Sequence, residues 1–514
     1  MVWGKFAISR WWLLLPIAAA LGVTATILFV RYFPFSEKNV TRTFGETFPG
    51  NYQFSHFKNV YFPRPGCTAE GVTFRSSTGE SGAALVVTAQ KLSLRGSYAG
   101  LLFHPHSVSR MLLEGLRVQI PPPGHAGDFF SEETPSRTTI GELVADGAVV
   151  EIARTDNQPP LKFEAHELRL SSVSANAGMA YRVDMHNPEP PGEITSAGHF
   201  GPFHNASAGQ TPLSGNFSFD RGDLGVFDGI SGFLTSTGSF SGPLANIQVQ
   251  GAVDVPDFEV VRSGHAGPLQ NRFSATVNGT NGDVTLNRVN AVYGKTQISA
   301  SGTVSHQGGR NGKFTSLDFT VRDGRIQDVL RIFVSENRPP MSGVTSFTAH
   351  VNVPPDGKPF LEEVGLQGDF EIVDGRFEKP STQANVNELS ATASGKKKAQ
   401  QTEQPNNPQE DVNAETRGHV VLHDAVATLT DLSFVVPGAD ARMHGTFNLL
   451  NQKIDFHGNV KMDANFSQQT SGIKSVFAKV LDPIFKKKNG SVVPVVMDGT
   501  YGHPHFGVDL NPVK

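Results

Sequence analysis

The chain has 514 residues and a net charge of −4 at pH 7, so its charge gives no reason to expect a nucleic-acid partner. This length allows two to four ordinary domains or one long repetitive domain. Phe is abundant, with 37 copies against three Trp and seven Tyr, and Gly is enriched at 53 copies. Because Phe lacks the polar group that Tyr and Trp carry, this composition favours a wide apolar sheet face.

Residues 11–30 form an uncharged apolar run that is long enough to cross a bilayer as a helix. At about 1.5 Å per residue, such a helix reaches roughly 30 Å, the thickness of a hydrocarbon core. We expect a cytoplasmic tail at 1–10 and a retained transmembrane helix at 11–31. A cleaved signal peptide ending near residues 18–20 is the alternative, but it would leave residues 23–30 as an apolar N-terminus.

From about residue 70 onward, apolar and polar residues alternate in short segments. Alternation with a period of two predicts strands with one apolar and one solvated face. We therefore expect a mainly β fold, an elongated and curved antiparallel sheet or β-groove with a few short helices. The positions expected to line one continuous apolar face are Ile298, Val304, Leu317, Phe319, Val321, Leu366, Phe370, Ile372, Ile454, Phe456 and Val460.

Local turn and helix signals interrupt the strands. Asn-Gly and Asp-Gly pairs predict hairpin turns at 278–279, 281–282, 323–324 and 374–375. Two short segments, 97–103 and 325–334, are expected to form helical turns packed against the sheet.

The clearest helix signal lies at 471–488, where apolar residues recur with a three-four spacing. The apolar face of this amphipathic helix consists of Ile473, Phe477, Val480, Leu481, Ile484 and Phe485. Two interpretations stay open. The helix caps one end of the sheet, or it touches a membrane surface or closes the end of a groove.

Composition divides the remaining chain. We expect an N-terminal β part at 32–120, a repetitive β-groove at 139–394 and a C-terminal part at 417–514. Residues 121–138 are rich in Pro, Gly and acids, which predicts a flexible loop. Residues 395–416 have almost no apolar content, so we expect a disordered insert there.

The sequence offers no set of residues that predicts catalysis. His104 and His106 lie two apart, as do His503 and His505, and each pair would share one face of a strand. Neither pair has a Cys, Asp or Glu at the spacing typical of a metal site. No nucleophile elbow, zinc-protease helix or phosphate loop is present. We therefore expect no catalytic residues, no metal, no cofactor and no enzymatic activity.

Several segments resemble the AsmA-like family of envelope proteins. The likeness begins at 188–203 with PEPPGEITSAGHFGPF, and it continues with GISGFLTSTGSFSGPL at 229–244 and VQGAVDVPDF at 249–258. After the helix at 471–488, the C-terminal part adds VPVVMDGTY at 493–501 and HPHFGVDL at 503–510.

This resemblance implies a single inner-membrane helix and a periplasmic domain built as a long, curved, open β-sheet. Proteins of this family, which are related to TamB and to chorein-type bridge proteins, are thought to move or regulate phospholipids between the two membranes of a diderm envelope. The implied partners are phospholipid and the inner membrane, and the family has no catalytic residues to carry over. An envelope scaffold or an assembly factor for outer-membrane proteins, using a sheet edge, is the alternative.

Overall fold

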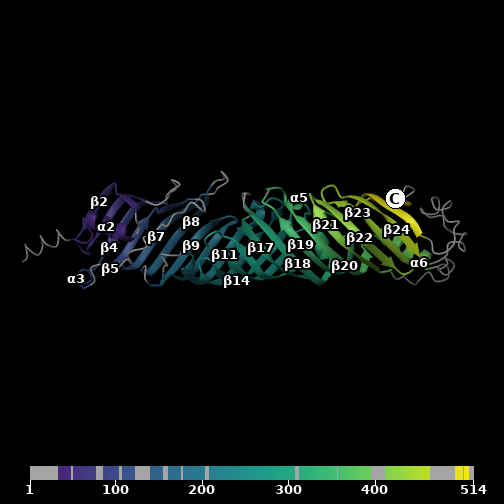
Figure 1. Ribbon diagram of the computed structural model, residues 1–514, viewed down its shortest axis with the longest axis horizontal. Coiled ribbons are helices and arrows are strands. Elements are labelled where there is room, and N and C mark those ends of the chain that lie inside the picture. The colour runs from purple at the N-terminus through teal and green to yellow at the C-terminus, as the bar shows by residue number, and fades with distance from the viewer. Residues whose placement is uncertain are drawn as a thin grey trace, which may run out of the picture. The chain divides into compact units, whose positions relative to one another are not determined.

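The computed structural model describes residues 33–47, 50–76, 85–103, 107–121, 139–153, 160–174, 177–202, 208–306, 312–355, 357–394, 411–463, 492–501 and 503–508. The chain divides into two compact units. Unit 1 comprises residues 1–186 and 196–212, and unit 2 comprises residues 187–195 and 213–514. The described residues form 26 strands and a few short helices, which confirms the expected mainly β fold (Figure 1).

Unit 1 begins with helix α2, Glu37–Thr47, and continues as a sheet. Its strands are β1 Gly50–Gln53, β2 His56–Val60, β3 Gly66–Ser76, β4 Val86–Arg95, β5 Ser107–Glu114, β6 Arg117–Ile120, β7 Thr139–Ile152, β8 Leu161–Val173 and most of β9 Met179–Pro188. Helix α3, Tyr98–Phe103, joins β4 to β5, and a short 3-10 turn η1 lies at Ala208–Gln210. Strand β10, Pro191–Phe200, contributes residues to both units.

Two pairings in unit 1 are parallel, so the expectation of a purely antiparallel sheet was wrong. Both β5 and β6 pair antiparallel with β4 and parallel with β7, and together they act as one interrupted strand. Parallel neighbours need a crossover of about a dozen residues or more, which the chain between Ile120 and Thr139 provides. Most of that connection, residues 122–138, lies outside the described residues.

Unit 2 contains a long antiparallel meander. Its strands are β11 Pro212–Asp223, β12 Ile230–Ser231, β13 Phe233–Pro243, β14 Ile247–Val260, β15 Gly267–Val277, β16 Val284–Tyr293, β17 Thr296–His306, β18 Lys313–Arg325, β19 Met341–Val353, β20 Gly365–Phe377, β21 Ala414–His423, β22 Val426–Val436, β23 Ala439–Asn448, β24 Lys453–Met462, β25 Val492–Thr500 and β26 His503–Val508. From β13 to β26 each strand pairs antiparallel with the next.

The described residues of unit 2 also form four short helices. They are η2 Leu224–Val226, α4 Ile326–Phe333, α5 Phe360–Glu363 and α6 Pro380–Ala393. Helices α3 and α4 confirm the helical turns expected at 97–103 and 325–334, whereas α2, α5 and α6 were not predicted. Strand β21 begins at Ala414, so the insert expected at 395–416 ends earlier than predicted. Its residues 395–410 lie outside the described residues.

Two of the expected turns are bulges instead. The turn between β15 and β16 does contain Asn278, whose carbonyl accepts from the Gly282 N–H at 2.6 Å. Asp323 and Asp374, with φ of 51° and 54°, lie within β18 and β20, where two residues oppose one on the neighbouring strand. Asp tolerates this left-handed conformation, and each bulge bends its strand and increases the local twist. Asp431, with φ of 52°, does the same in β22.

The two membrane-related predictions lie outside the described residues. These are the span expected at 11–31 and the amphipathic helix expected at 471–488, including Ile473, Phe477, Val480, Leu481, Ile484 and Phe485. Within the described part of the chain, which starts at Phe33, none of the helices combines the length and apolarity that a membrane span requires.

Candidate functional site on the apolar face of unit 2

Strand register brings the predicted apolar positions together. Side chains of directly paired residues lie on the same face of a sheet, as do alternate residues along one strand. The continuous pairings of β17 to β25 therefore place all the predicted positions on one face. They are Ile298, Val304, Leu317, Phe319, Val321, Leu366, Phe370, Ile372, Ile454, Phe456 and Val460.

An unbroken line of apolar residues crosses this face. We call it the apolar row, and it runs through directly paired residues of β13 to β24. Its members are Phe240, Val249, Ala275, Leu286, Gly302, Leu317, Val351, Leu366, Leu422, Ala427, Phe447 and Ile454. None of these residues carries a charge or a polar side chain, so this row is apolar across twelve successive strands, whereas Thr315, Thr345 and Thr416 lie on the same face outside it.

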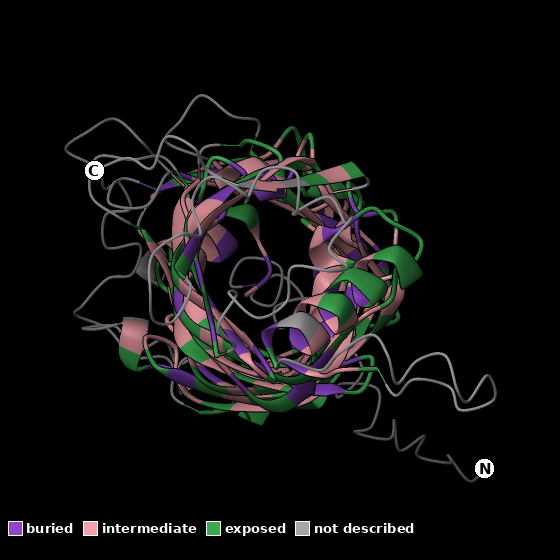
Figure 2. Ribbon diagram, turned by 90° about the vertical axis from the view of Figure 1, so that its right-hand side faces the viewer, coloured by how far each residue is buried: buried purple, intermediate pink, exposed green. Residues whose placement is uncertain are grey.

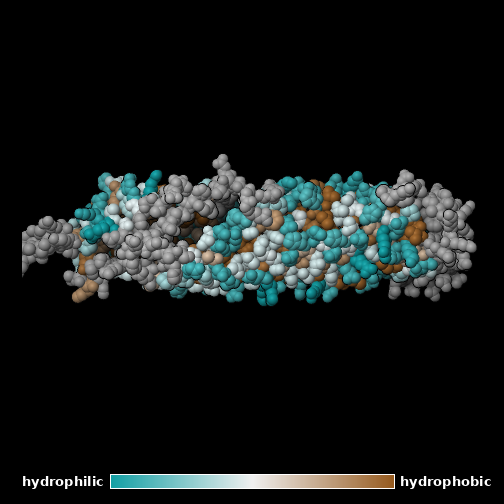
Figure 3. Space-filling view, viewed as in Figure 1, coloured by the Kyte–Doolittle hydropathy of each residue, from teal (hydrophilic) through white to brown (hydrophobic). Residues whose placement is uncertain are grey.

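The opposite face is polar. On β17 the intervening residues 297, 299, 301 and 303 are Gln, Ser, Ser and Thr, and all are exposed. Cross-strand pairs on this side include His350 Nδ1 with Asp318 at 2.8 Å and His419 Nδ1 with Asp369 at 2.8 Å. Figure 3 shows hydrophilic colours over much of the surface of β17 to β24. The sheet of unit 2 is therefore one-sided, as the alternation predicted.

The predicted positions differ in how deeply they are covered. Val321, Ile372, Ile454, Phe456 and Val460 are buried. The remaining positions, Ile298, Val304, Leu317, Phe319, Leu366 and Phe370, are half-buried.

Two helices account for part of this difference in burial between the predicted positions. Ile372 packs with Ile326 of α4, and Val460 packs with Val386 of α6. These helices cover parts of the apolar face. Phe370 packs against the cluster that contains Ile326 of α4, and Leu366 packs against a cluster that contains Leu361 of α5. The half-buried positions that remain as the candidate lining are Ile298, Val304, Leu317 and Phe319. Phe456 is buried and so does not belong to an accessible lining.

The sheet of unit 2 rolls up so that the strand ends along one side meet the strand ends along the other side. Phe258, Val260, Ile332 and Phe333 lie at the edge where β14 and β18 end. They form one cluster with residues at the opposite edge, on α5 and the hairpin ends of β19 to β24, namely Leu361, Val364, Leu422, Ala425, Leu449 and Phe447. We call this contact the seam. Figure 2 views unit 2 from its C-terminal end and shows the strands curving.

Hydrogen bonds reinforce the seam. The Phe360 N–H donates to the carbonyl oxygen of Asp228 at 3.0 Å. The Arg262 guanidinium donates to the carbonyl oxygen of Leu450, and the Gln452 amide donates to the Ser335 hydroxyl. The apolar face therefore lies on the inside of a roll, and the open trough that the resemblance implied is corrected for unit 2.

A titratable group lies beside the seam. Tyr501 donates its backbone N–H to the carbonyl oxygen of Gln452 at 2.9 Å. Burial, together with the nearby Glu336 carboxylate, raises the pKa of Tyr501 to about 12. The phenol therefore stays neutral at physiological pH and adds no charge at the seam.

Glycines on the apolar face lie beneath aromatic rings. A Cβ on Gly238 would lie 2.6 Å from the Phe217 ring, and a Cβ on Gly251 would lie 3.0 Å from the Phe273 ring. Packing an aromatic ring over a strand glycine compensates for the missing side chain. Gly238 and Gly251 thus provide room for the rings of Phe217 and Phe273, a pairing that the alternation of the strands did not predict.

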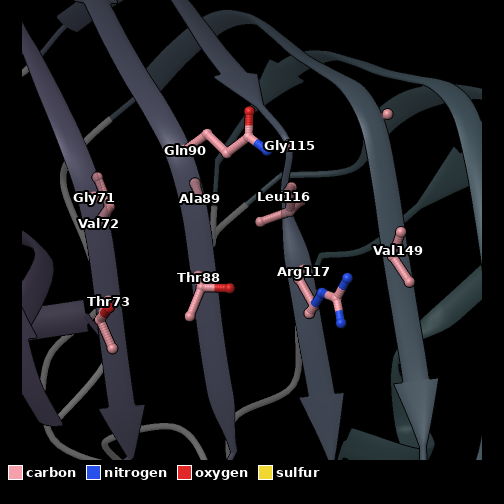
Figure 4. Close-up of a pocket in the computed structure, with 11 residues that line it drawn as sticks. Gly71, Val72, Thr73, Thr88, Ala89, Gln90, Gly115, Leu116, Arg117 and Val149 are labelled. Atoms are coloured by element: carbon pink, nitrogen blue, oxygen red, sulfur yellow. The ribbon is translucent and has the colours of Figure 1, made fainter.

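Unit 1 contains a separate hollow of about 480 Å³ (Figure 4). Three of its lining glycines, Gly71, Gly115 and Gly147, have φ of 59°, 62° and 64°. These left-handed positions lie on β3, at the break between β5 and β6, and on β7, and glycine adopts this conformation without steric cost. Arg117, a titratable side chain of the lining, pairs with Glu151 at 3.0 Å, so the hollow offers little reactive chemistry.

The residues whose side chains could bind a metal or take part in catalysis are dispersed. His104 and His106 lie outside the described residues, and His505 Nδ1 pairs with Asp498 at 3.1 Å. In the described part of the chain, no cluster of three or more His, Cys, Asp or Glu residues could hold a metal ion. Cys67 is buried, and this burial raises its pKa to about 12 despite the nearby Arg95.

Comparisons with known proteins found no match for this chain, whether among protein-family models, curated proteins or solved structures.

Proposed function

We propose that this protein is anchored in the inner membrane by residues 11–31 and binds phospholipid acyl chains inside the roll of unit 2. In this role it helps to move or regulate phospholipids between the inner and outer membranes, and it is not an enzyme. The observation that carries the proposal is the apolar row, which continues from Phe240 to Ile454 without a polar side chain.

The energetics of acyl chains favour such a surface. A phospholipid has roughly thirty methylenes, and each costs about 0.8 kcal/mol when it is exposed to water. Exposing both chains would cost on the order of 20 kcal/mol. The half-buried Phe319, Leu317 and Ile298 offer apolar area along the face, and removing it from water favours binding. Since the row carries no polar group to fix a ligand, binding would be tolerant of lipid identity.

The sequence adds support of a different kind. The segments at 188–203, 229–244 and 249–258 resemble the AsmA-like family, and this likeness implies phospholipid as the ligand and the periplasm as the compartment. This support rests on strand and turn patterns, and it is independent of the register that aligns the apolar row.

An envelope scaffold or an outer-membrane assembly factor is the second candidate. Its supporting observation is β26, His503–Val508, which is the last described strand and pairs with β25 on one side. A terminal strand can bind a partner by adding it to the sheet edge. Such a function would use the backbone of β26 and would leave the apolar row without a ligand.

One pair of variants tests the proposal. Ile298 faces the inside of the roll, and its neighbour Ser299 is exposed on the outer face. The full-length protein and the variants Ile298→Asp and Ser299→Asp are purified, and the phospholipid that copurifies is extracted and counted per chain. We expect Ile298→Asp to lose lipid and Ser299→Asp to keep the parental amount. Equal lipid in both variants would contradict the proposal, because all lipid would then surround the anchor.

A further inference from the structure

Unit 1 exposes four large aromatic residues next to the start of its described chain. Phe62 is 83% exposed, Phe103 76%, Tyr98 44% and Tyr61 37%. We call these four residues the aromatic patch. Figure 3 shows apolar surface at the place where Figure 1 draws α3, the helix that carries Tyr98 and Phe103.

Direct contacts hold the patch together. Tyr61 and Phe62 follow β2 in the chain, and the Tyr98 hydroxyl donates to the carbonyl oxygen of Tyr61. The ring of Phe33 lies 4.8 Å from the ring of Tyr61, centroid to centroid. Phe33 itself is fully buried, together with Phe35 and Val40 of the unit 1 core. Tyr61 and Tyr98 of the patch are therefore held in place, and the start of the described chain is fixed beside them.

The chain preceding Phe33 determines what can lie opposite the patch. The uncharged apolar run ends at residue 30, three residues before Phe33. Three residues span at most about 11 Å when fully extended. If residues 11–31 cross the membrane, Phe33 and the adjacent Tyr61 must lie within about this distance of the bilayer surface.

The charge around the patch suits a membrane surface. The segments 56–64 and 97–103 contain Lys58 and Arg64, and they contain no Asp or Glu. Lys58 and Arg64 are both exposed. Basic side chains near a bilayer are attracted to anionic headgroups, while aromatic rings are favoured at the membrane–water interface.

We infer that the aromatic patch of Tyr61, Phe62, Tyr98 and Phe103 inserts into the headgroup region of the phospholipid bilayer that holds the anchor. This second contact fixes the orientation of unit 1 on the membrane, which a single helix followed by a short connection leaves free to rotate. The inference rests on the anchor of the proposed function, but it does not depend on lipid binding inside unit 2.

Spin labels on the full-length protein test this contact. The variants Phe62→Cys and Phe103→Cys are reconstituted into vesicles of phosphatidylethanolamine and phosphatidylglycerol. Val261→Cys, which is 54% exposed on unit 2, is the matched control. Cys67 stays in place, since it is buried and its raised pKa leaves the thiol protonated. Accessibility to oxygen, which dissolves in lipid, is compared with accessibility to a water-soluble nickel chelate.

We expect the labels at 62 and 103 to lose access to the nickel chelate and to keep access to oxygen, and the label at 261 to be reached by the chelate. Access of the chelate to either position of the patch, at the level of the control, would overturn the inference. Dipolar broadening between labels on different copies would also overturn it, because a second copy of the chain would then cover the patch. Failure of unit 2 to bind lipid would leave these results unchanged, so the two proposals fail separately.

Discussion

The Phe360 N–H donates to the carbonyl oxygen of Asp228 at 3.0 Å, and this bond joins opposite edges of the sheet in unit 2. The next residue, Gly229, has φ of +91°, and a Cβ there would lie 2.8 Å from the Phe360 nitrogen. The seam therefore closes where a glycine permits close approach of two backbones. Because the seam encloses the apolar face, its integrity bears directly on what the roll can hold.

Gly229→Val should open the seam locally. The substitution places a side chain against Phe360 and strains the backbone, so we expect the free energy of unfolding to fall by about 1–3 kcal/mol. The measurement is cross-linking of Asp228→Cys to Pro359→Cys by a short bis-maleimide, which the seam should favour and Gly229→Val should reduce.

Gly264→Val is the matched control for this prediction. Gly264 has φ of +69°, but a Cβ there would meet no atom within 4 Å. The control therefore suffers backbone strain without touching the seam, and its cross-linking should stay at the parental level. Equal cross-linking in Gly229→Val and Gly264→Val would show that the seam does not depend on this contact.

Gly238→Ala should destabilise unit 2, although Ala is the smallest replacement. Its Cβ would lie 2.4 Å from the carbonyl oxygen of Gln250 and 2.6 Å from the Phe217 ring. We expect a loss of about 1–3 kcal/mol in denaturant unfolding, as is typical of overpacking. Gly365→Ala is the control, because its nearest neighbour, the carbonyl oxygen of Asn352, would lie 3.7 Å away. A tolerated Gly238→Ala would refute the packing of Phe217 over Gly238.

Gln383→Ala should detach α6 from the sheet. The buried Gln383 amide oxygen accepts from the Phe377 N–H at 2.9 Å, and its NH₂ group donates to the carbonyl oxygen of Val412 at 3.0 Å. Removing both hydrogen bonds, which are partly buried, should cost about 1–3 kcal/mol. Asn385→Ala, at an exposed position of the same helix, should change the unfolding midpoint little. Similar midpoints for the two variants would mean that Gln383 does not hold α6 in place.

Asp283 should make stability depend on acid pH. Burial acts to raise its pKa, but hydrogen bonds from the His306 backbone and ring outweigh burial and hold the pKa below its usual value. Because the folded-state pKa is lower than the unfolded one, the stabilisation is present above about pH 4 and is lost as pH falls through the folded-state pKa.

The pair is partly exposed, so Asp283→Asn should cost less than about 1 kcal/mol at neutral pH. That difference from the parent should vanish in urea unfolding at acid pH below the folded-state pKa. Asp220→Asn, at an exposed position of β11, is the control and should show a smaller difference. A difference for Asp283→Asn that stayed constant across the pH range would contradict the ionic origin of the effect.

Much of the sidedness of unit 2 was predictable, because a strand has a side-chain period of two. The alternation around Ile298 and Phe319 decides which residues share a face, and pairing between neighbours only aligns them. The prediction of hairpin turns at Asp323 and Asp374 was wrong. An Asp-Gly pair suits the left-handed conformation both of hairpin turns and of bulges, so local sequence alone does not distinguish them.

Other features depend on contacts that no local pattern encodes. The buried face of α6 includes Gln383 and Ser390, which are satisfied by hydrogen bonds and therefore leave no apolar periodicity to recognise. The seam between Asp228 and Phe360 depends on curvature that accumulates over many strands. The parallel placement of β7 follows from a long connection whose course the composition does not specify.

Photo-cross-linking from adjacent residues of β18 distinguishes lipid bound inside the roll from lipid at its outer face. Phe319 is half-buried on the apolar face, and Asp318 is exposed on the outer face. A photoreactive amino acid is placed at one position or the other in the full-length protein, and adducts formed in intact cells are identified by mass. We expect phospholipid adducts from position 319 and none from position 318. Equal yields from both positions, or no lipid adduct at 319, would contradict this expectation.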